Sequence, residues 1–119
     1  MKRRNGSGSG PGILLRKGSV FLISLPSRSG DHTQQSRRYA VVVTATSFIG
    51  SVVTVAPTST SARASLTRPE AEIQGQKCRI LLEQMLAVDI SKLTNWIGVL
   101  DDREMDALDD ALRLYHGLI

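Results

Sequence analysis

The final third of the chain decides the fold, and residues 79–119 read RILLEQMLAVDISKLTNWIGVLDDREMDALDDALRLYHGLI. Apolar runs predict one strand over Cys78–Gln84 and a second over Trp96–Leu100. A short connector over Asp89–Leu93 separates them. After Leu100 the apolar residues change to helical spacing. We therefore expect a strand, a connector, a strand and a terminal helix, in that order.

The terminal helix carries a full set of local signals. Asp101 is a suitable N-cap, and Glu104, three residues later, can complete a capping box. Apolar residues recur at spacings of three and four and define one face, made of Met105, Leu108, Leu112 and Tyr115. Acidic residues gather in the first turns, where the helix dipole favours them, and Gly117 is a typical end signal. We expect one amphipathic helix packed on the strands.

The rest of the chain reads as short strands separated by polar loops. The predicted strands are Gly18–Leu25, Tyr39–Thr46, Ser51–Ala56 and Glu70–Ile73, and the main loops are Ser27–Gln35 and Thr58–Ser65. The run over Tyr39–Thr46 is nearly continuous in apolar residues, which indicates burial on both faces of the strand. A mainly β chain with one terminal helix belongs to the α+β class.

The length of 119 residues allows one domain. Residues 1–16 are basic and rich in glycine and serine, so we expect a flexible tail before a single domain over residues 17–119. The apolar runs are far shorter than the ~20 residues that span a bilayer, and the start does not read as a secretory signal. Cys78 is the single cysteine and cannot form an internal disulfide, so we expect a cytoplasmic protein.

The charge is distributed unevenly along the chain. Residues 1–40 contain eight Lys or Arg and one acid, Asp31, which gives that segment a net charge of +7. Residues 101–119 contain six acids and two arginines, a net charge of −4. A basic first third and an acidic helix suggest that a polyanion meets the N-terminal part of the domain.

Several kinds of catalytic site are excluded by the sequence pattern. The chain has no His/Cys cluster with zinc spacing, no glycine-rich phosphate loop ending in Lys-Ser or Lys-Thr, and no serine in a nucleophile elbow. Metal-free chemistry or pure binding remains, and we expect no metal and no cofactor.

Arg38 is the leading candidate for metal-free chemistry on a phosphate. Its planar guanidinium can bind two phosphate oxygens and stabilise the charge that develops on phosphorus. It directly precedes the apolar run Ala40–Val43, which places its backbone rigidly. From the residues alone, this interpretation and an ordinary pair of exposed arginines at a strand start are equally good.

The order of these elements, together with residues 34–43 (QQSRRYAVVV), resembles the MazF/PemK family of toxin endoribonucleases over roughly residues 17–119. The resemblance implies a small, strongly bent barrel of the Src-homology-3-like kind with a C-terminal helix. It implies metal-independent cleavage of single-stranded RNA, mainly messenger RNA, at a short sequence, to a 2′,3′-cyclic phosphate and a 5′-hydroxyl. It also implies a symmetric homodimer whose RNA groove is blocked by the acidic C-terminal segment of a cognate antitoxin.

The resemblance also implies roles for particular residues. Arg38 stands where the family has a catalytic arginine followed by proline, and here Tyr39 takes the place of that proline. Thr58 falls in a strand-end motif, VAPTST, whose hydroxyl works with the arginine, so we expect it to be the second catalytic residue. The expected RNA-binding residues are Arg37, Tyr39, Gln34, Gln84, Ser59 and His32.

Glu83 and Gln84 match an acid-glutamine pair of the family. On a strand, their side chains point to opposite faces. We therefore expect Gln84 to face the RNA and Glu83 to be structural, with Arg79 or Lys77 as its salt-bridge partner.

Two other functions remain open from the sequence. One is a non-catalytic module of the same fold that binds RNA or a protein, because a fold alone does not decide function. The other is a toxin of similar fold that poisons DNA gyrase, which predicts gyrase binding and no RNA cleavage.

Overall fold

Strand β3 (Val52–Ser59) is the element around which the sheet is organised. The structure is a computed structural model that describes residues 15–26, 35–44 and 51–117. Residues 52–55 of β3 pair with β6, residues 55–57 pair with β2, and the last two, Thr58 and Ser59, pair with β5. The path of neighbouring strands runs β4-β5-β3-β2-β1-β7, with β6 on β3, and every pairing is antiparallel. The strands are β1 (Ser19–Pro26), β2 (Gln35–Val42), β3 (Val52–Ser59), β4 (Glu70–Ile73), β5 (Gln76–Ile80), β6 (Leu86–Asp89) and β7 (Trp96–Val99).

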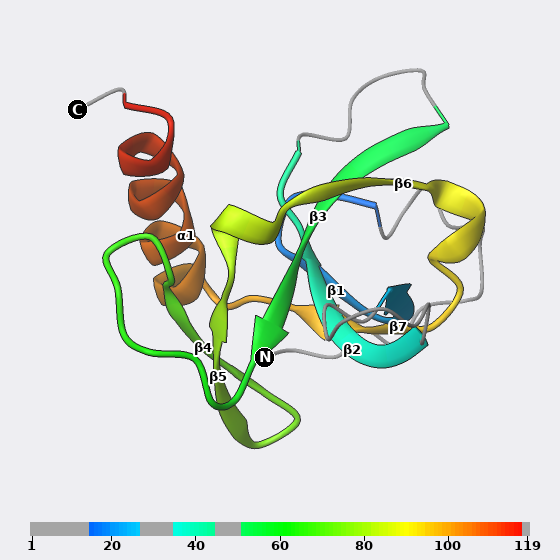
Figure 1. Cartoon of the computed structure of the whole chain (residues 1–119), viewed down its shortest axis with the longest axis horizontal. Helices are drawn as coiled ribbons and strands as arrows, with labels where there is room; N and C mark the ends of the chain where they lie inside the picture. The colour runs from blue at the N-terminus through cyan, green and yellow to red at the C-terminus, as the bar shows by residue number, and fades with distance from the viewer. Residues whose placement is uncertain (1–14, 27–34, 45–50, 118–119) are drawn as a thin grey trace.

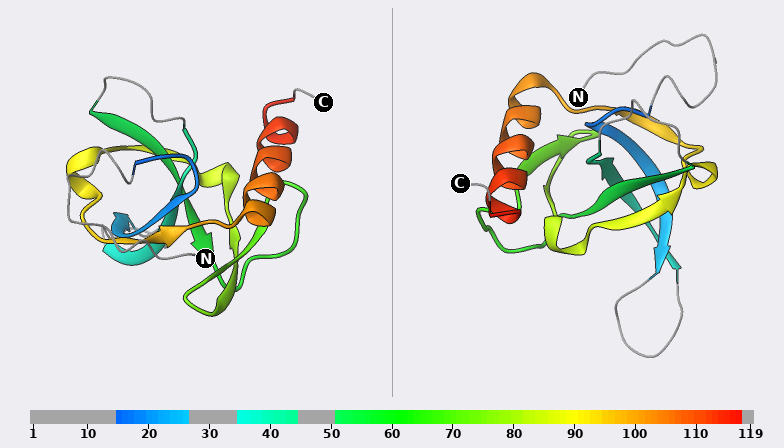
Figure 2. Two further views of the ribbon diagram at one scale, coloured as in Figure 1. Left: turned by 180° about the vertical axis from the view of Figure 1, so that it is seen from behind. Right: turned by 90° about the horizontal axis from the view of Figure 1, so that it is seen from above.

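The sheet curls into a bent half-barrel, with helix α1 (Asp102–Tyr115) beside β4 and β5 (Figure 1). Two short 3-10 turns complete the described elements, η2 (Leu82–Gln84) and η3 (Ile90–Lys92). From behind and from above, α1 lies at one end of the curled sheet and β6 with η3 at the other (Figure 2). The predicted α+β class and the small, mainly β bent barrel with a C-terminal helix are confirmed. No helix in the described ranges is long and apolar enough to cross a membrane.

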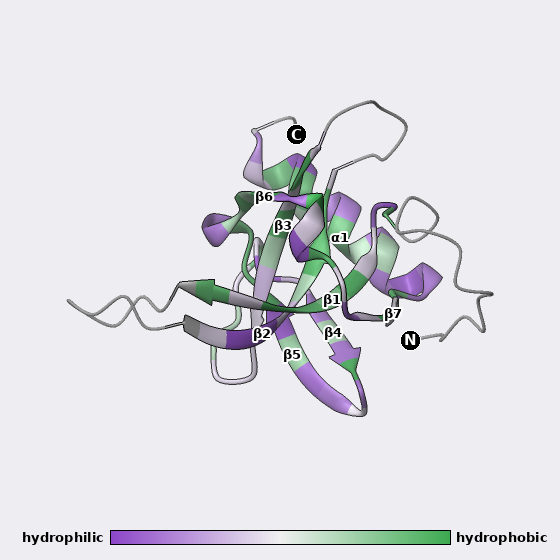
Figure 3. Ribbon diagram, turned by 90° about the vertical axis from the view of Figure 1, so that its right-hand side faces the viewer, coloured by the Kyte–Doolittle hydropathy of each residue, from purple (hydrophilic) through white to green (hydrophobic). Residues whose placement is uncertain are grey.

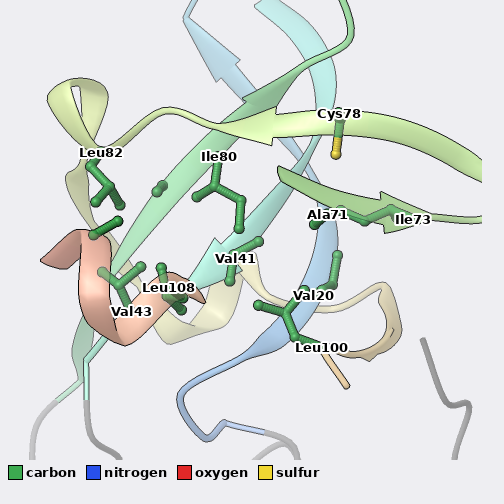
Figure 4. Close-up of a cluster of buried hydrophobic side chains, with 12 residues drawn as sticks. Val20, Val41, Val43, Ala71, Ile73, Cys78, Ile80, Leu82, Leu100 and Leu108 are labelled. Carbon is green, nitrogen blue, oxygen red and sulfur yellow. The ribbon is translucent and has the colours of Figure 1, made fainter. Parts of the chain in front are cut away.

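Two clusters of buried side chains fill the two faces of the sheet. Neighbouring residues of β2 divide between them, because side chains alternate along a strand. Val41 and Leu108 of the helix belong to the first cluster, which we call the cluster under α1 (Figure 4). Val42 and Phe21 belong to the second cluster. All four residues of Ala40–Val43 are buried, so the predicted burial on both faces is confirmed for this part of the run, whereas Tyr39 and Thr44 are only partly buried. Figure 3 shows that β1 is largely hydrophobic and that the start of β2 is hydrophilic.

Helix α1 begins where the sequence predicts. The Asp101 side chain accepts a hydrogen bond from the Glu104 N–H at 2.8 Å, and the Glu104 carboxylate accepts one from the Asp101 N–H at 3.0 Å. This reciprocal capping box satisfies two donors that the first turn leaves unpaired. Leu108 and Ala111 are buried against the sheet, but Tyr115 at the end of the predicted apolar face is 41% exposed.

The predicted strand over Cys78–Gln84 is wrong beyond Ile80. The Leu81 N–H donates to the Pro57 carbonyl at 2.9 Å, and the Gln84 N–H then donates back to the Leu81 carbonyl at 3.0 Å. The first bond joins the end of β5 to β3, and the second closes the turn η2 in place of further strand. The chain resumes as β6, a strand that the sequence analysis did not predict.

The predicted loop over Thr58–Ser65 begins too early, because β3 continues through Pro57 to Ser59. Pro57 has no N–H to donate to a neighbouring strand, and for this reason the sequence predicts that the strand ends before it. Here its carbonyl accepts from Leu81, and the Thr58 hydroxyl donates to the Tyr39 carbonyl at 2.9 Å. The contact between β2 and β3 is thus extended by a side chain.

Candidate functional site

A cavity of about 270 Å³ lies between the end of β1, the middle of β2, the last part of β3, and the turn η2 with the start of β6. Its lining combines an apolar floor with three polar side chains. The lining residues are Leu25, Arg38, Pro57, Glu83, Gln84, Met85 and Leu86. We call it the Arg38 cavity. A hollow with a mainly apolar wall and a few convergent polar groups is the usual form of a binding site.

Arg38 is held rigidly at this cavity by its strand. It lies in β2 directly across from Ile23 of β1, and the buried Ala40 follows two residues later. The Arg38 side chain itself is only partly buried. Arg37, its neighbour, points to the other face of β2 and lines a different cavity. Only one of the two adjacent arginines therefore serves the Arg38 cavity.

Gln84 reaches the Arg38 cavity because η2 is a turn. The sequence analysis placed Glu83 and Gln84 on opposite faces of a strand, and that placement is wrong. Both residues belong to η2, and both line the cavity. The structure therefore brings together Arg38 and Gln84, which lie 46 positions apart in the sequence.

Glu83 forms its salt bridge with Arg68, so the predicted pairing with Arg79 or Lys77 is wrong. The Arg68 Nη2 and Nε atoms lie 2.7 and 3.1 Å from Glu83 Oε2. The hydrogen bond to Glu83 raises the pKa of Arg68. Arg79 instead donates from Nη1 to the Arg68 carbonyl at 2.9 Å, and so holds the backbone of the arginine that pairs with Glu83.

This ion pair sets the charge at the cavity mouth. A bare carboxylate beside Arg38 would repel a phosphate, and an opposite charge at hydrogen-bonding distance offsets that repulsion. Arg68 lies in the segment between β3 and β4, fifteen residues from Glu83. No local sequence pattern marks such a pair, so the sequence analysis missed it.

Thr58 lies beside the Arg38 cavity without lining it. The residue is 7% exposed, and its hydroxyl donates to the carbonyl of Tyr39, the residue after Arg38. Burial raises the pKa of the Cys78 thiol, and a hydrogen bond with Thr58 opposes that rise, so the hydroxyl faces the cluster under α1. In this arrangement Thr58 fixes the backbone next to Arg38. A direct contact of Thr58 with a ligand stays a prediction.

The remaining predicted RNA-binding residues are dispersed. Tyr39 is partly buried and packs against the cluster under α1. The Ser59 hydroxyl accepts from the Ser61 N–H at 3.2 Å at the end of β3. His32 and Gln34 lie outside the described residues. Within the described ranges, no three His, Cys, Asp or Glu residues are grouped so as to hold a metal ion.

Several solved structures have the same architecture as this chain. A mycobacterial endoribonuclease, solved in complex with its cognate antitoxin, superposes with a TM-score of 0.72 at 15% identity, covering 87% of this chain and 96% of that one. The Mycobacterium tuberculosis toxin MazF-mt6 superposes with a TM-score of 0.66 at 18% identity, covering 83% and 96%. MazF in a MazE–MazF structure from Deinococcus radiodurans gives 0.67 at 15%, covering 89% and 98%. These similarities show the fold.

Sequence comparison identifies the family. A toxin candidate from Mycobacterium tuberculosis is 38% identical over 106 residues, which cover 88% of this chain and 100% of the relative. The family described as “PemK-like, MazF-like toxin of type II toxin-antitoxin system” matches residues 16–116. The chain therefore belongs to the PemK-like, MazF-like family of type II toxins.

Proposed function

We propose that this toxin is an endoribonuclease that cleaves single-stranded RNA, mainly messenger RNA, at a short sequence. The products are a 2′,3′-cyclic phosphate and a 5′-hydroxyl, and the reaction uses no metal. The observation that carries the proposal is the Arg38 cavity, where an arginine held in β2 and the Gln84 amide share a hollow whose carboxylate, Glu83, is paired with Arg68. Family membership and the endoribonuclease among the structural neighbours support it.

The arrangement suits attack by a ribose 2′-hydroxyl on the adjacent phosphate. Negative charge grows on the phosphate oxygens in the transition state, and a preorganised guanidinium stabilises it without having to reorient. Gln84 has both a donor and an acceptor and can fix the phosphate or a base edge. Thr58 is the proposed second catalytic residue, although contact with the phosphate requires its hydroxyl to leave the Tyr39 carbonyl.

The proposed assembly is a symmetric homodimer that a cognate antitoxin neutralises. Two of the similar solved structures are toxins with their antitoxins, one mycobacterial and one from Deinococcus radiodurans. An extended acidic antitoxin segment is the proposed inhibitor, because it would compete with RNA for the same cations.

Incubation of the purified chain with single-stranded RNA in EDTA tests the proposal. We expect cuts at a recurrent short sequence, with cyclic phosphate on the upstream fragment and hydroxyl on the downstream fragment. Binding without cutting would show a non-catalytic module instead. Intact RNA together with direct binding to DNA gyrase would show a toxin that poisons gyrase.

Removal of the Arg68 side chain is expected to weaken RNA binding through the charge of Glu83. Arg68→Ala removes the cation that pairs with Glu83 and makes the charge beside the phosphate more negative by one unit, and we expect a rise in KM of about tenfold, which corresponds to ~1.4 kcal/mol. The double variant Arg68→Ala with Glu83→Gln removes the charge and should restore most of the affinity. Steady-state cleavage at a fixed salt concentration measures both.

A purely structural role for the ion pair predicts a different pattern. Glutamine cannot replace the lost bonds from Arg68, so a misplaced η2 would stay misplaced in the double variant. A double variant as weak as Arg68→Ala would therefore contradict the electrostatic role. Thermal unfolding of both variants serves as the control for folding.

A further inference from the structure

A second cavity, of about 340 Å³, lies on the other side of the β1–β2 ribbon. It is formed by the middle of β1, by one residue of β2, by the last residue of η3 and by the segment that joins η3 to β7. The lining residues are Leu22, Ile23, Ser24, Arg37, Lys92, Thr94 and Asn95. Two cations and three neutral polar side chains line it, and no carboxylate is among them. We call it the Arg37–Lys92 cavity.

The two cavities cannot hold the same phosphate. Arg37 and Arg38 are consecutive in β2, and their side chains leave the strand on opposite faces. Arg37 lies directly across from Ser24, which lines the Arg37–Lys92 cavity, whereas Leu25 lines the Arg38 cavity. The β1–β2 ribbon separates the two cations, although they are neighbours in the sequence.

Lys92 is placed at the Arg37–Lys92 cavity by its own turn. Asp89 caps η3 and accepts a hydrogen bond from the Ser91 N–H at 2.9 Å. That bond is the main reason why the pKa of Asp89 is lowered, and the charge of Lys92 contributes less. Even when Asp89 is counted with Arg37 and Lys92, the local charge stays positive. Segment 92–95 is fixed to β1, because the Leu22 N–H donates to the Asn95 carbonyl at 2.9 Å.

We propose that the Arg37–Lys92 cavity binds a backbone phosphate of the RNA, some nucleotides away from the phosphate that is cut. This rests on the proposed function and extends it to a substrate longer than the cleaved linkage. Arginine and lysine supply the charge, and the hydroxyls of Ser24 and Thr94 with the Asn95 amide can bind phosphate oxygens or a ribose hydroxyl. Lys92 thereby becomes an RNA-binding residue that the sequence analysis did not identify.

Binding to uncleavable RNA tests this inference independently of catalysis. Fully 2′-O-methylated RNA has no attacking hydroxyl, so its Kd can be measured by fluorescence anisotropy over a series of salt concentrations. For Lys92→Gln we expect affinity to fall by up to about fivefold, the range of one exposed ion pair. The slope of log K against log salt should become shallower by about 0.7, the value for one phosphate contact on a single strand.

The length of the RNA distinguishes a defined phosphate subsite from non-specific electrostatic attraction. The effect of Lys92→Gln should be present with RNA of about twelve nucleotides and absent with a dinucleotide, because its single linking phosphate cannot occupy both cavities. The matched control is Lys77→Gln, which removes the same charge from an exposed site of β5 beside Glu70 and Glu72. This control should leave both affinity and slope unchanged.

Three results would overturn the inference. One is an equal effect of Lys92→Gln at both lengths, and another is an equal effect of Lys77→Gln. The third is unchanged RNA affinity together with weaker binding of the cognate antitoxin, which would assign the cavity to an acidic peptide. Failure of RNA cleavage in EDTA would instead count against the proposed function. The binding results could still be interpreted, because they do not depend on cleavage.

Discussion

Substitution of Arg38 by alanine is expected to lower the rate of RNA cleavage by about 10²- to 10³-fold, the usual loss for one preorganised charge-stabilising donor. The guanidinium contributes in the transition state because β2 already places Arg38 at the cavity, paired with Ile23 of β1 and two residues before buried Ala40. The loss should appear in the single-turnover rate at saturating RNA, which isolates the chemical step from binding.

Two further substitutions make the Arg38 result specific. Arg38→Lys keeps the charge but loses the planar fork, so its rate should fall between those of the alanine variant and the original chain. Arg103→Ala removes an equal charge from an exposed position of α1 and should leave the rate unchanged. An Arg38→Ala variant that cuts at the original rate would move the chemistry to another site.

Substitution of Gly18 by alanine is expected to destabilise the fold by about 2–3 kcal/mol. Gly18 has φ +94°, a conformation that costs an L-residue about 1–2 kcal/mol. An added Cβ would also come within 2.3 Å of Met105 Sδ, so the methionine must leave its place against the cluster under α1. Met105 is only partly buried and its side chain is flexible, so moving it adds about 1 kcal/mol, the low end of the usual cost of overpacking.

The backbone at Gly18 cannot relax without a further cost. Its N–H donates to the Val42 carbonyl at 2.8 Å, and its carbonyl accepts from the Leu100 N–H at 2.9 Å. Urea unfolding should show a lower midpoint with an unchanged slope. Gly75→Ala is the matched control, because Gly75 has φ +78° with no atom within 4 Å of the added Cβ, so only the backbone cost of about 1–2 kcal/mol applies. Equal losses at both positions would show that Met105 contributes nothing.

The parts of the fold that were predictable from the sequence have local causes. The capping box needs only Asp101 and Glu104, three residues apart, and both of its hydrogen bonds form. The run Ala40–Val43 is apolar at every position, which leaves no polar face for solvent, and all four residues are buried. Such local patterns predict the same structure whichever other segments pack against them.

The parts that were not predictable depend on distant contacts. Leu81 and Leu82 continue an apolar run and read as strand, but pairing with β3 ends at the bond from the Leu81 N–H to the Pro57 carbonyl, and the chain then turns as η2. That turn brings Gln84 to Arg38 and gives Glu83 its partner Arg68. The composition of the Arg38 cavity is therefore a tertiary property, although Arg38 itself was predictable.

The crystal structure of the chain bound to a 2′-O-methylated RNA that contains the mapped cleavage sequence tests the central claim most directly. We predict one phosphate in the Arg38 cavity, with its oxygens at about 2.7–2.9 Å from the Arg38 guanidinium, and the Gln84 amide in contact with the same nucleotide. RNA bound elsewhere on the surface, with this cavity lacking a phosphate and Arg38 facing solvent, would contradict it.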